Sequence, residues 1–139
     1  MSQLDSLENR RFFLRKNERL RSKIAFEYLF EHGSRFSVGV LRFFYAFDVP
    51  PGLSQAALSV AVTAPKRSFK HAVDRNLLKR RMREAFRLNK HILLPALTQK
   101  GKNLIILVKY NNARIAPYDG IAYAMSTALR RIEKELNNS

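Results

Sequence analysis

The side chains that usually carry catalysis are few and scattered in this sequence. Its three histidines, His32, His71 and His91, have no paired spacing for a metal ion, and the chain contains no cysteine to join them. The 11 acidic residues are dispersed, whereas a protein-borne two-metal nuclease needs several clustered carboxylates. The five glycines stand alone, so the sequence contains no glycine-rich phosphate loop. Any catalysis in which the chain takes part is therefore expected to come from a partner.

Positive charge is the chemistry that the sequence does concentrate. The 139 residues contain 26 Lys and Arg against 11 Asp and Glu, a formal net charge of +15. Residues 64–91 hold ten basic and two acidic side chains, which is more than half of the excess. A patch of this kind indicates a polyanionic partner, and nucleic acid is the commonest one. Composition does not separate DNA from RNA.

The sequence predicts a packed domain without a membrane segment. Its hydrophobic fraction of 46% is ordinary for a globular protein. The N-terminus lacks the apolar core of a signal peptide, and prolines and a glycine interrupt the longest uncharged stretch, Val49 to Pro65. The absence of cysteine fits a reducing compartment. We expect a cytoplasmic protein with no membrane partner.

The elements that must position the charges are three helices and several strands. Helices are expected over Ser22 to Glu31, from about Ala72 to about His91, and after Pro117. Strands are expected over residues 36–47, over 56–64 as a return strand of a hairpin, and over 103–108, whose apolar run predicts burial on both faces. The order helix, strands, helix, strand, helix predicts one α+β domain.

The helix expected after residue 71 separates apolar from basic side chains. At about 100° per residue, Leu78, Met82, Ala85 and Phe86 gather on one face. The opposite face carries Asn76, Lys79, Arg80, Arg83, Arg87, Lys90 and His91. A solvated helix face normally mixes signs at i, i+4, and Glu84 alone cannot compensate for five cations. Bound phosphates would neutralise this face and release counterions, so the pattern predicts nucleic-acid binding.

The segment Ala64 to Arg87, APKRSFKHAVDRNLLKRRMREAFR, resembles the signature of the protein subunit of bacterial ribonuclease P. The matching pieces are the P-K-R-x-F-K lead-in, A-V-x-R-N at residues 72–76, K-R at 79–80 and R-E at 83–84. Upstream, Arg19 to Gly33 resembles the first helix of that family, with two Phe four residues apart before a Gly. Leu77 stands where the family usually has the second Arg of Arg-Asn-Arg, and Arg81, one turn later, is a candidate substitute.

This resemblance covers roughly residues 13–135, which leaves residues 1–12 as an N-terminal extension and 136–139 as a C-terminal tail. It implies a small α/β sandwich in which a left-handed crossover, the rare hand for such a connection, leads into the motif helix. It also implies an accessory subunit without catalytic residues of its own. The partner, ribonuclease P RNA with bound magnesium ions, would hydrolyse the phosphodiester that joins the 5′ leader to precursor tRNA. One protein copy per RNA is expected.

Two binding surfaces follow from the resemblance. The motif helix would bind the catalytic RNA through Arg75, Asn76, Lys79, Arg80 and Arg83, and the helix periodicity adds Arg87. A cleft between the sheet and the first helix would bind the single-stranded leader through Phe26 and Phe30, with Lys66 and Arg67 at its basic rim. Aromatic stacking in a cationic groove holds single strands without reading their sequence. However, the i, i+4 spacing of the two Phe residues by itself is more typical of core positions than of ligand platforms, and only the resemblance makes the two interpretations even.

The third aromatic residue of this cleft is either Phe44 or Tyr45. Strand alternation puts Val40, Arg42, Phe44 and Ala46 on one face and Leu41, Phe43, Tyr45 and Phe47 on the other. The face with Arg42 is the better candidate for a nucleic-acid cleft, which favours Phe44. Tyr110, after the apolar run at 103–108, is a further candidate for stacking.

Two other classes of function compete with this interpretation. A structural RNA-binding protein of ribosomal type fits the size and charge equally well. A DNA-binding module would need two short helices joined by a tight turn, and the helices expected here are separated by strands.

Overall fold

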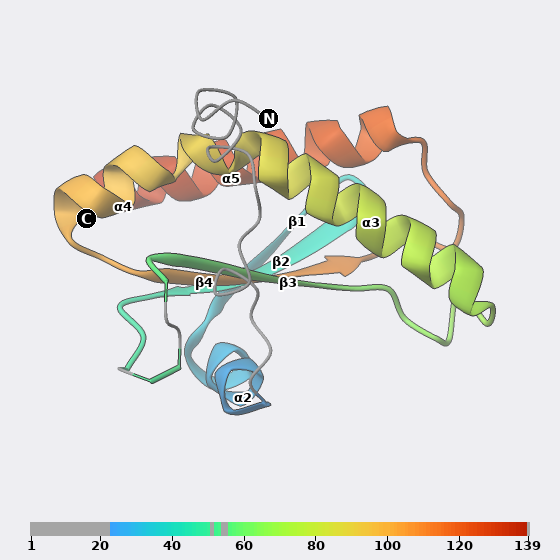
Figure 1. The fold of residues 1–139 in the computed structure, drawn as a ribbon, viewed down its shortest axis with the longest axis horizontal. Helices are drawn as coiled ribbons and strands as arrows, with labels where there is room; N and C mark the ends of the chain where they lie inside the picture. Colours follow the sequence, from blue (N-terminus) through green and yellow to red (C-terminus); the bar gives the residue numbers. More distant parts are fainter. Residues whose placement is uncertain (1–22, 51, 54–55, 139) are drawn as a thin grey trace, which may run out of the picture.

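The chain forms a four-stranded sheet with helices on both of its faces (Figure 1). The structure is a computed structural model that describes residues 23–50, 52–53 and 56–138. In chain order the elements are α2 (Lys23–His32), β1 (Ser34–Val38), β2 (Leu41–Phe47), β3 (Leu58–Thr63), α3 (Ala72–Asn89), the short 3-10 helix η2 (Lys90–Ile92), α4 (Leu94–Lys100), β4 (Leu104–Tyr110) and α5 (Tyr118–Asn137). The predicted α+β class is confirmed. The predicted extension at residues 1–12 lies outside the described residues.

The strands are ordered β1-β2-β4-β3. β1 and β4 both pair with β2 in antiparallel orientation, whereas β3 pairs with β4 in parallel orientation. Every residue from Leu104 to Val108 is buried, which confirms the prediction that this run is covered on both faces. A strand of this kind is most stable in the interior of a sheet, because both of its faces must be shielded from water.

Two predictions about strand pairing are wrong. Residues 36–47 do not form one strand but the β1–β2 hairpin, which turns at Gly39 with a φ of +53°, a conformation that glycine adopts without steric cost. The strand at residues 58–63 does not return along β2 in a hairpin. It lies beyond β4, because β4 takes the place beside β2.

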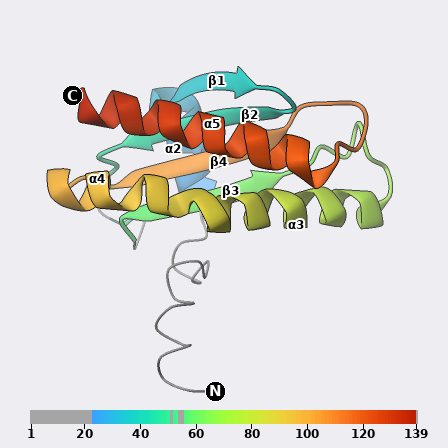
Figure 2. The same ribbon diagram turned by 90° about the horizontal axis from the view of Figure 1, so that it is seen from above.

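The connection from β3 to β4 runs through α3, η2 and α4. In Figure 2 these helices lie in front of the sheet while the chain passes from β3 to β4, both of which point to the right. When this view is turned so that the strands point upward and the helices stay toward the viewer, β4 lies to the left of β3. The crossover is therefore left-handed, as the family resemblance implied. The short helix α4 was not predicted. Pro95 lies in its first turn, where the missing amide proton of proline leaves no intrahelical bond unmade.

Two apolar cores lie on the two sides of the sheet. The larger one packs α3, α4 and α5 against the face that carries Phe43, Tyr45 and Tyr110. The smaller one packs Ala25 and Leu29 of α2 against the opposite face. Figure 1 shows α2 alone on that side, with the other three helices on the far side of the sheet.

The last helix continues further than the sequence indicated. α5 ends at Asn137, and Leu136 is fully buried in the larger core. The predicted tail at residues 136–139 is therefore wrong for residues 136–137. Within the described part of the chain, no helix has both the length and the apolar character needed to cross a membrane.

Candidate nucleic-acid interface

The amphipathic division predicted for the motif helix is present in α3. Leu78, Met82, Ala85 and Phe86 are fully buried beneath the helix. Asn76, Arg80 and Arg83 are exposed on its outer side, and Lys79 is half-buried. Lys90, which the helix periodicity placed among the basic residues, has only 3% of its surface exposed. α3 ends at Asn89, and Lys90 begins the 3-10 helix that follows.

Arg87 differs from the prediction because the chain's own carboxylate neutralises it. Its Nε and Nη2 atoms donate to the two carboxylate oxygens of Glu84 at 3.0 and 2.5 Å. The hydrogen bond from Arg87 lowers the pKa of Glu84, which keeps this carboxylate charged at neutral pH. The open cationic surface of α3 is therefore centred on Lys79, Arg80 and Arg83.

The side chains of two other arginines of α3 hold neighbouring loops by hydrogen bonds to backbone carbonyl groups. The Nη1 atom of Arg75 donates to the carbonyl oxygens of Phe69 and Lys70, at 2.7 and 2.9 Å. The Nη1 atom of Arg81 donates to the carbonyl oxygen of Ala116 at 2.7 Å. Arg81 thus supports the loop before α5, and its suggested replacement of the Arg missing at Leu77 stays a prediction.

The predicted aromatic cleft residues meet on the opposite face of the sheet. Phe30 of α2 has 52% of its surface exposed, and its ring meets the edge of Phe44 with 5.4 Å between the ring centroids. Phe26, one turn earlier, is partly buried against the smaller core. Phe44 rather than Tyr45 faces α2, because Tyr45 lies under α5 and its hydroxyl donates to the carboxylate of Glu135. The choice of Phe44 from strand alternation is therefore correct in position.

Cations surround the Phe44 ring. The guanidinium carbons of Arg35 and Arg42 lie 5.7 and 5.4 Å from its centroid, within the range of a cation–π interaction. Lys109 of β4 is exposed and is paired in register with Arg42, so it lies on the same face. Arg35 and Lys109 were missed from the sequence, because the register of β1, β2 and β4 was needed to place them beside Phe44.

Lys66 and Arg67 are exposed in the loop that connects β3 to α3. The last residue of β3, Thr63, is paired with Lys109, so this loop leaves the sheet at the end where the cations of the cleft gather. The amides of Ser68 and Phe69 donate to the carbonyl oxygen of Pro65, which forms a single tight turn around the two cations. This location agrees with the predicted basic rim.

Tyr110 cannot stack on a ligand. It is fully buried in the larger core, where its ring packs edge-on against Phe69 at a centroid distance of 5.6 Å. Its hydroxyl donates to the carbonyl oxygen of Arg114 and accepts a bond of 2.8 Å from the amide of Ala116. Because neighbouring residues of a strand point to opposite faces, Lys109 faces the cleft and Tyr110 faces away from it.

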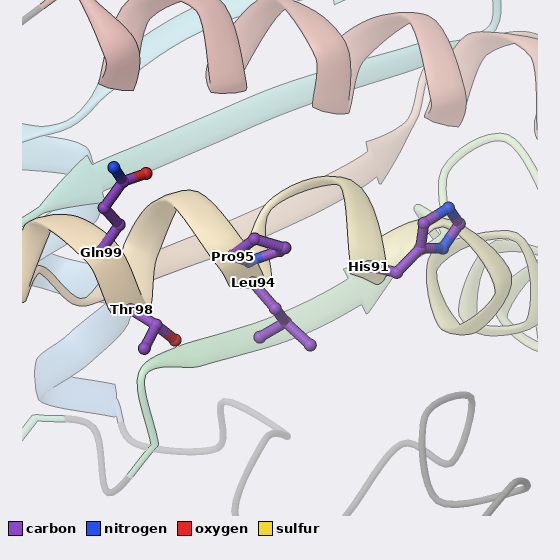
Figure 3. Close-up of a pocket in the computed structure, with 5 residues that line it drawn as sticks. All are labelled: His91, Leu94, Pro95, Thr98 and Gln99. Carbon is purple, nitrogen blue, oxygen red and sulfur yellow. The ribbon is translucent and has the colours of Figure 1, made fainter.

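A hollow of about 700 Å³ lies along η2 and α4 (Figure 3). It is lined by His91, Leu94, Pro95, Thr98 and Gln99, none of which was predicted as a site residue. Among the described residues, no group of three or more His, Cys, Asp or Glu side chains is placed to hold a metal ion.

Comparisons with known proteins place the chain in a family. The sequence model of the family Ribonuclease P matches residues 14–133. The chain is similar to the ribonuclease P protein component of Porphyromonas gingivalis, with 31% identity over 92% of both chains. It is also similar to that of Chlorobaculum tepidum, with 38% identity over 77% of this chain and 72% of the relative.

Solved structures share the fold at lower identity. The ribonuclease P protein of Staphylococcus aureus has a TM-score of 0.63 at 16% identity, covering 83% of this chain and 94% of its own. The protein from Thermotoga maritima has a TM-score of 0.61 at 22% identity, covering 82% and 96%. The family model and the sequence relatives extend over most of the chain, and the structural neighbours have the same architecture. The chain therefore belongs to the bacterial ribonuclease P protein family.

Proposed function

We propose that this protein binds ribonuclease P RNA through α3 and the 5′ leader of precursor tRNA through the cleft beside α2. The RNA contacts of α3 are assigned to Asn76, Lys79, Arg80 and Arg83. Arg75 and Arg87 contribute less, because Arg75 donates to the carbonyl groups of the preceding loop and the charge of Arg87 is neutralised by Glu84. The protein itself supplies no step of the chemistry. It assists the RNA in hydrolysing the phosphodiester bond that joins the 5′ leader to the tRNA.

The observation that carries the leader site is the environment of Phe44. The guanidinium groups of Arg35 and Arg42 lie close to the Phe44 ring, and the half-exposed ring of Phe30 packs against it in a T-shaped arrangement. Phe44 itself is only 8% exposed and supports the site from beneath, so the π-face open to an unpaired base is that of Phe30, and the two arginines offer positive charge to the phosphates. Such a site contains few groups that would select a base. A processing subunit that acts on many precursors needs this sequence tolerance.

The two proposed surfaces use different modes of recognition. α3 is a convex row of cations and suits the backbone of a folded RNA, which proteins recognise mainly by shape and phosphate contacts. The cleft suits a flexible single strand. We assign the magnesium ions of the reaction to the RNA partner, with one protein copy bound per RNA, and we place the complex in the cytoplasm.

The test is reconstitution with the catalytic RNA. The protein alone is expected to leave precursor tRNA uncut. Added to the RNA at low magnesium concentration, it should stimulate cleavage, and it should favour precursors with a leader over leaderless tRNA in binding. Failure to stimulate the RNA at any salt or magnesium concentration would refute the proposal.

The alternative of a structural protein of ribosomal type has no support from the comparisons. It makes a separate prediction, which is recovery of the protein with ribosomal subunits. The proposed function predicts recovery with a single RNA species of the ribonuclease P type.

A further inference from the structure

The loop between β3 and α3, residues 64–71, physically connects the two proposed RNA-binding surfaces. It leaves the sheet at the cleft and ends at His71, the residue before α3. Lys66, Arg67 and Ser68 are exposed along it. Within the loop, the backbone bonds are those of the Ser68 and Phe69 amides, which donate to the same carbonyl oxygen of Pro65 at 3.3 and 3.1 Å. Its conformation therefore depends on contacts with the rest of the protein.

Arg75 provides the polar part of those contacts. A single nitrogen, Nη1, donates to the consecutive carbonyl oxygens of Phe69 and Lys70 at 2.7 and 2.9 Å. Both bonds are charge-assisted, and such bonds are stronger than those between neutral groups. The side chain begins in the first turn of α3 and reaches back across the preceding loop. It thereby fixes the backbone two to three residues after Arg67.

Phe69 provides the apolar part. Its side chain is buried in the larger core and packs against Tyr110. Tyr110 is itself held at its hydroxyl by the backbone of the loop before α5. The end of the loop is thus anchored on one side by a rigid aromatic pair and on the other by the Arg75 guanidinium.

We propose that Arg75 is a positioning residue for the leader-binding cleft, which holds residues 65–70 so that Lys66 and Arg67 face the leader. This inference rests on the proposed function, since it assumes that the cleft binds the leader. It assigns to Arg75 a role distinct from that of its neighbours on α3. Arg80 and Arg83 act on the catalytic RNA, whereas Arg75, besides its smaller contribution to RNA binding, acts through the loop on the substrate.

The first test needs no RNA. In Arg75→Ala, hydrogen exchange at the amides of Ser68 and Phe69 should become faster by about tenfold or more, the factor that a charge-assisted bond typically represents. Arg80→Ala is the matched control, because it removes the same side chain from the exposed side of the same helix. Its loop amides should exchange as in the wild type. Equal exchange in the two variants would overturn the proposal.

The second test is a double-mutant cycle measured with the assembled ribonucleoprotein. The quantity is the ratio of affinities for precursor tRNA with and without its leader. Arg75→Ala and the pair Lys66→Ala with Arg67→Ala should each lower this ratio, and the combined variant should lower it no further than the pair does. Additive losses would show that Arg75 acts independently of the rim cations, and they would overturn the positioning role.

The affinity of each variant for the catalytic RNA distinguishes the role of Arg80 from that of Arg75. Arg80→Ala should weaken assembly and leave the leader ratio unchanged, whereas Arg75→Ala should lower the leader ratio and weaken assembly less than Arg80→Ala does. If the wild-type complex bound precursors equally well with and without leaders, the leader site of the proposed function would fail, and with it the role of Arg75 in substrate binding. The exchange result would still report whether Arg75 holds the loop.

Discussion

Phe30→Ala tests whether the exposed ring on α2 binds RNA or belongs to the core. The two interpretations predict different losses, because about half of the ring surface is exposed to solvent (52%) and the remainder packs against Phe44 and its surroundings. Truncating a fully buried Phe to Ala costs about 3–5 kcal/mol of folding free energy. For a half-buried ring we expect roughly 2 kcal/mol.

A folding loss of this size does not by itself weaken binding. A domain of ordinary stability, about 5–15 kcal/mol, would remain more than about 99% folded after losing roughly 2 kcal/mol. A ring that stacks on a base contributes about 1–3 kcal/mol to affinity. Loss of that stack would weaken binding of a leader-bearing precursor roughly 5- to 150-fold, so the binding effect is distinguishable from the folding effect.

The assay is the equilibrium affinity of the assembled ribonucleoprotein for precursor tRNA and for mature tRNA. Phe30→Ala should weaken only the first. Ile24→Ala is the control, since Ile24 is 64% exposed on the same helix, about 120° around the axis from Phe30. Ile24→Ala should change neither affinity. Equal losses for both tRNAs, or no loss beyond that of the control, would refute the placement of Phe30 in the leader site.

Three further predictions address other parts of the structure. Glu84→Gln should remove the negative charge that neutralises Arg87, tighten assembly with the RNA and make the slope of log affinity against log salt steeper by about one, as measured in a salt titration. Leu136→Ala should lower the free energy of unfolding by roughly 2–5 kcal/mol in denaturant, because this side chain is fully buried, whereas an unchanged midpoint would contradict its place in the core. Burial and the hydrogen bond to Glu135 raise the pKa of Tyr45 from 10.0 to about 12. The stability of the wild type relative to Tyr45→Phe should therefore be fully present below pH 10 and decline between pH 10 and 12, as followed by denaturation at each pH.

Local pattern was sufficient for the elements whose environment is uniform along their length. The 100° periodicity of residues 75–89 located the buried face of α3, because one continuous helix packs one stripe against the sheet. The alternation in β2 correctly separated Phe44 from Tyr45, since adjacent strand residues must point to opposite faces. The bounds of α2 and the start of α5 were likewise close to those expected.

Pairing between distant segments was not predictable in the same way. The residue pattern of 58–63 does not indicate whether this strand pairs with β2 or with β4. The pairing depends on β4, which must be buried on both faces and therefore lies in the interior of the sheet. The turn at Gly39 was overlooked because the apolar pattern continues through it. Arg35 and Lys109 lie at the cleft because the register of β1, β2 and β4 pairs Arg35 with Phe44 and Lys109 with Arg42.

The period with which apolar and basic residues recur along the sequence is enough to define the buried side and the cationic side of α3. The contacts that the individual cations make depend on the tertiary structure. Arg75 and Arg81 hold loops and Arg87 pairs with Glu84, whereas Arg80 is exposed on the outer side of the helix. The physical reason is that a long side chain reaches several ångströms from its backbone. Its partner is therefore set by whichever carbonyl or carboxylate the fold brings within that reach, and helix periodicity carries no information about those groups.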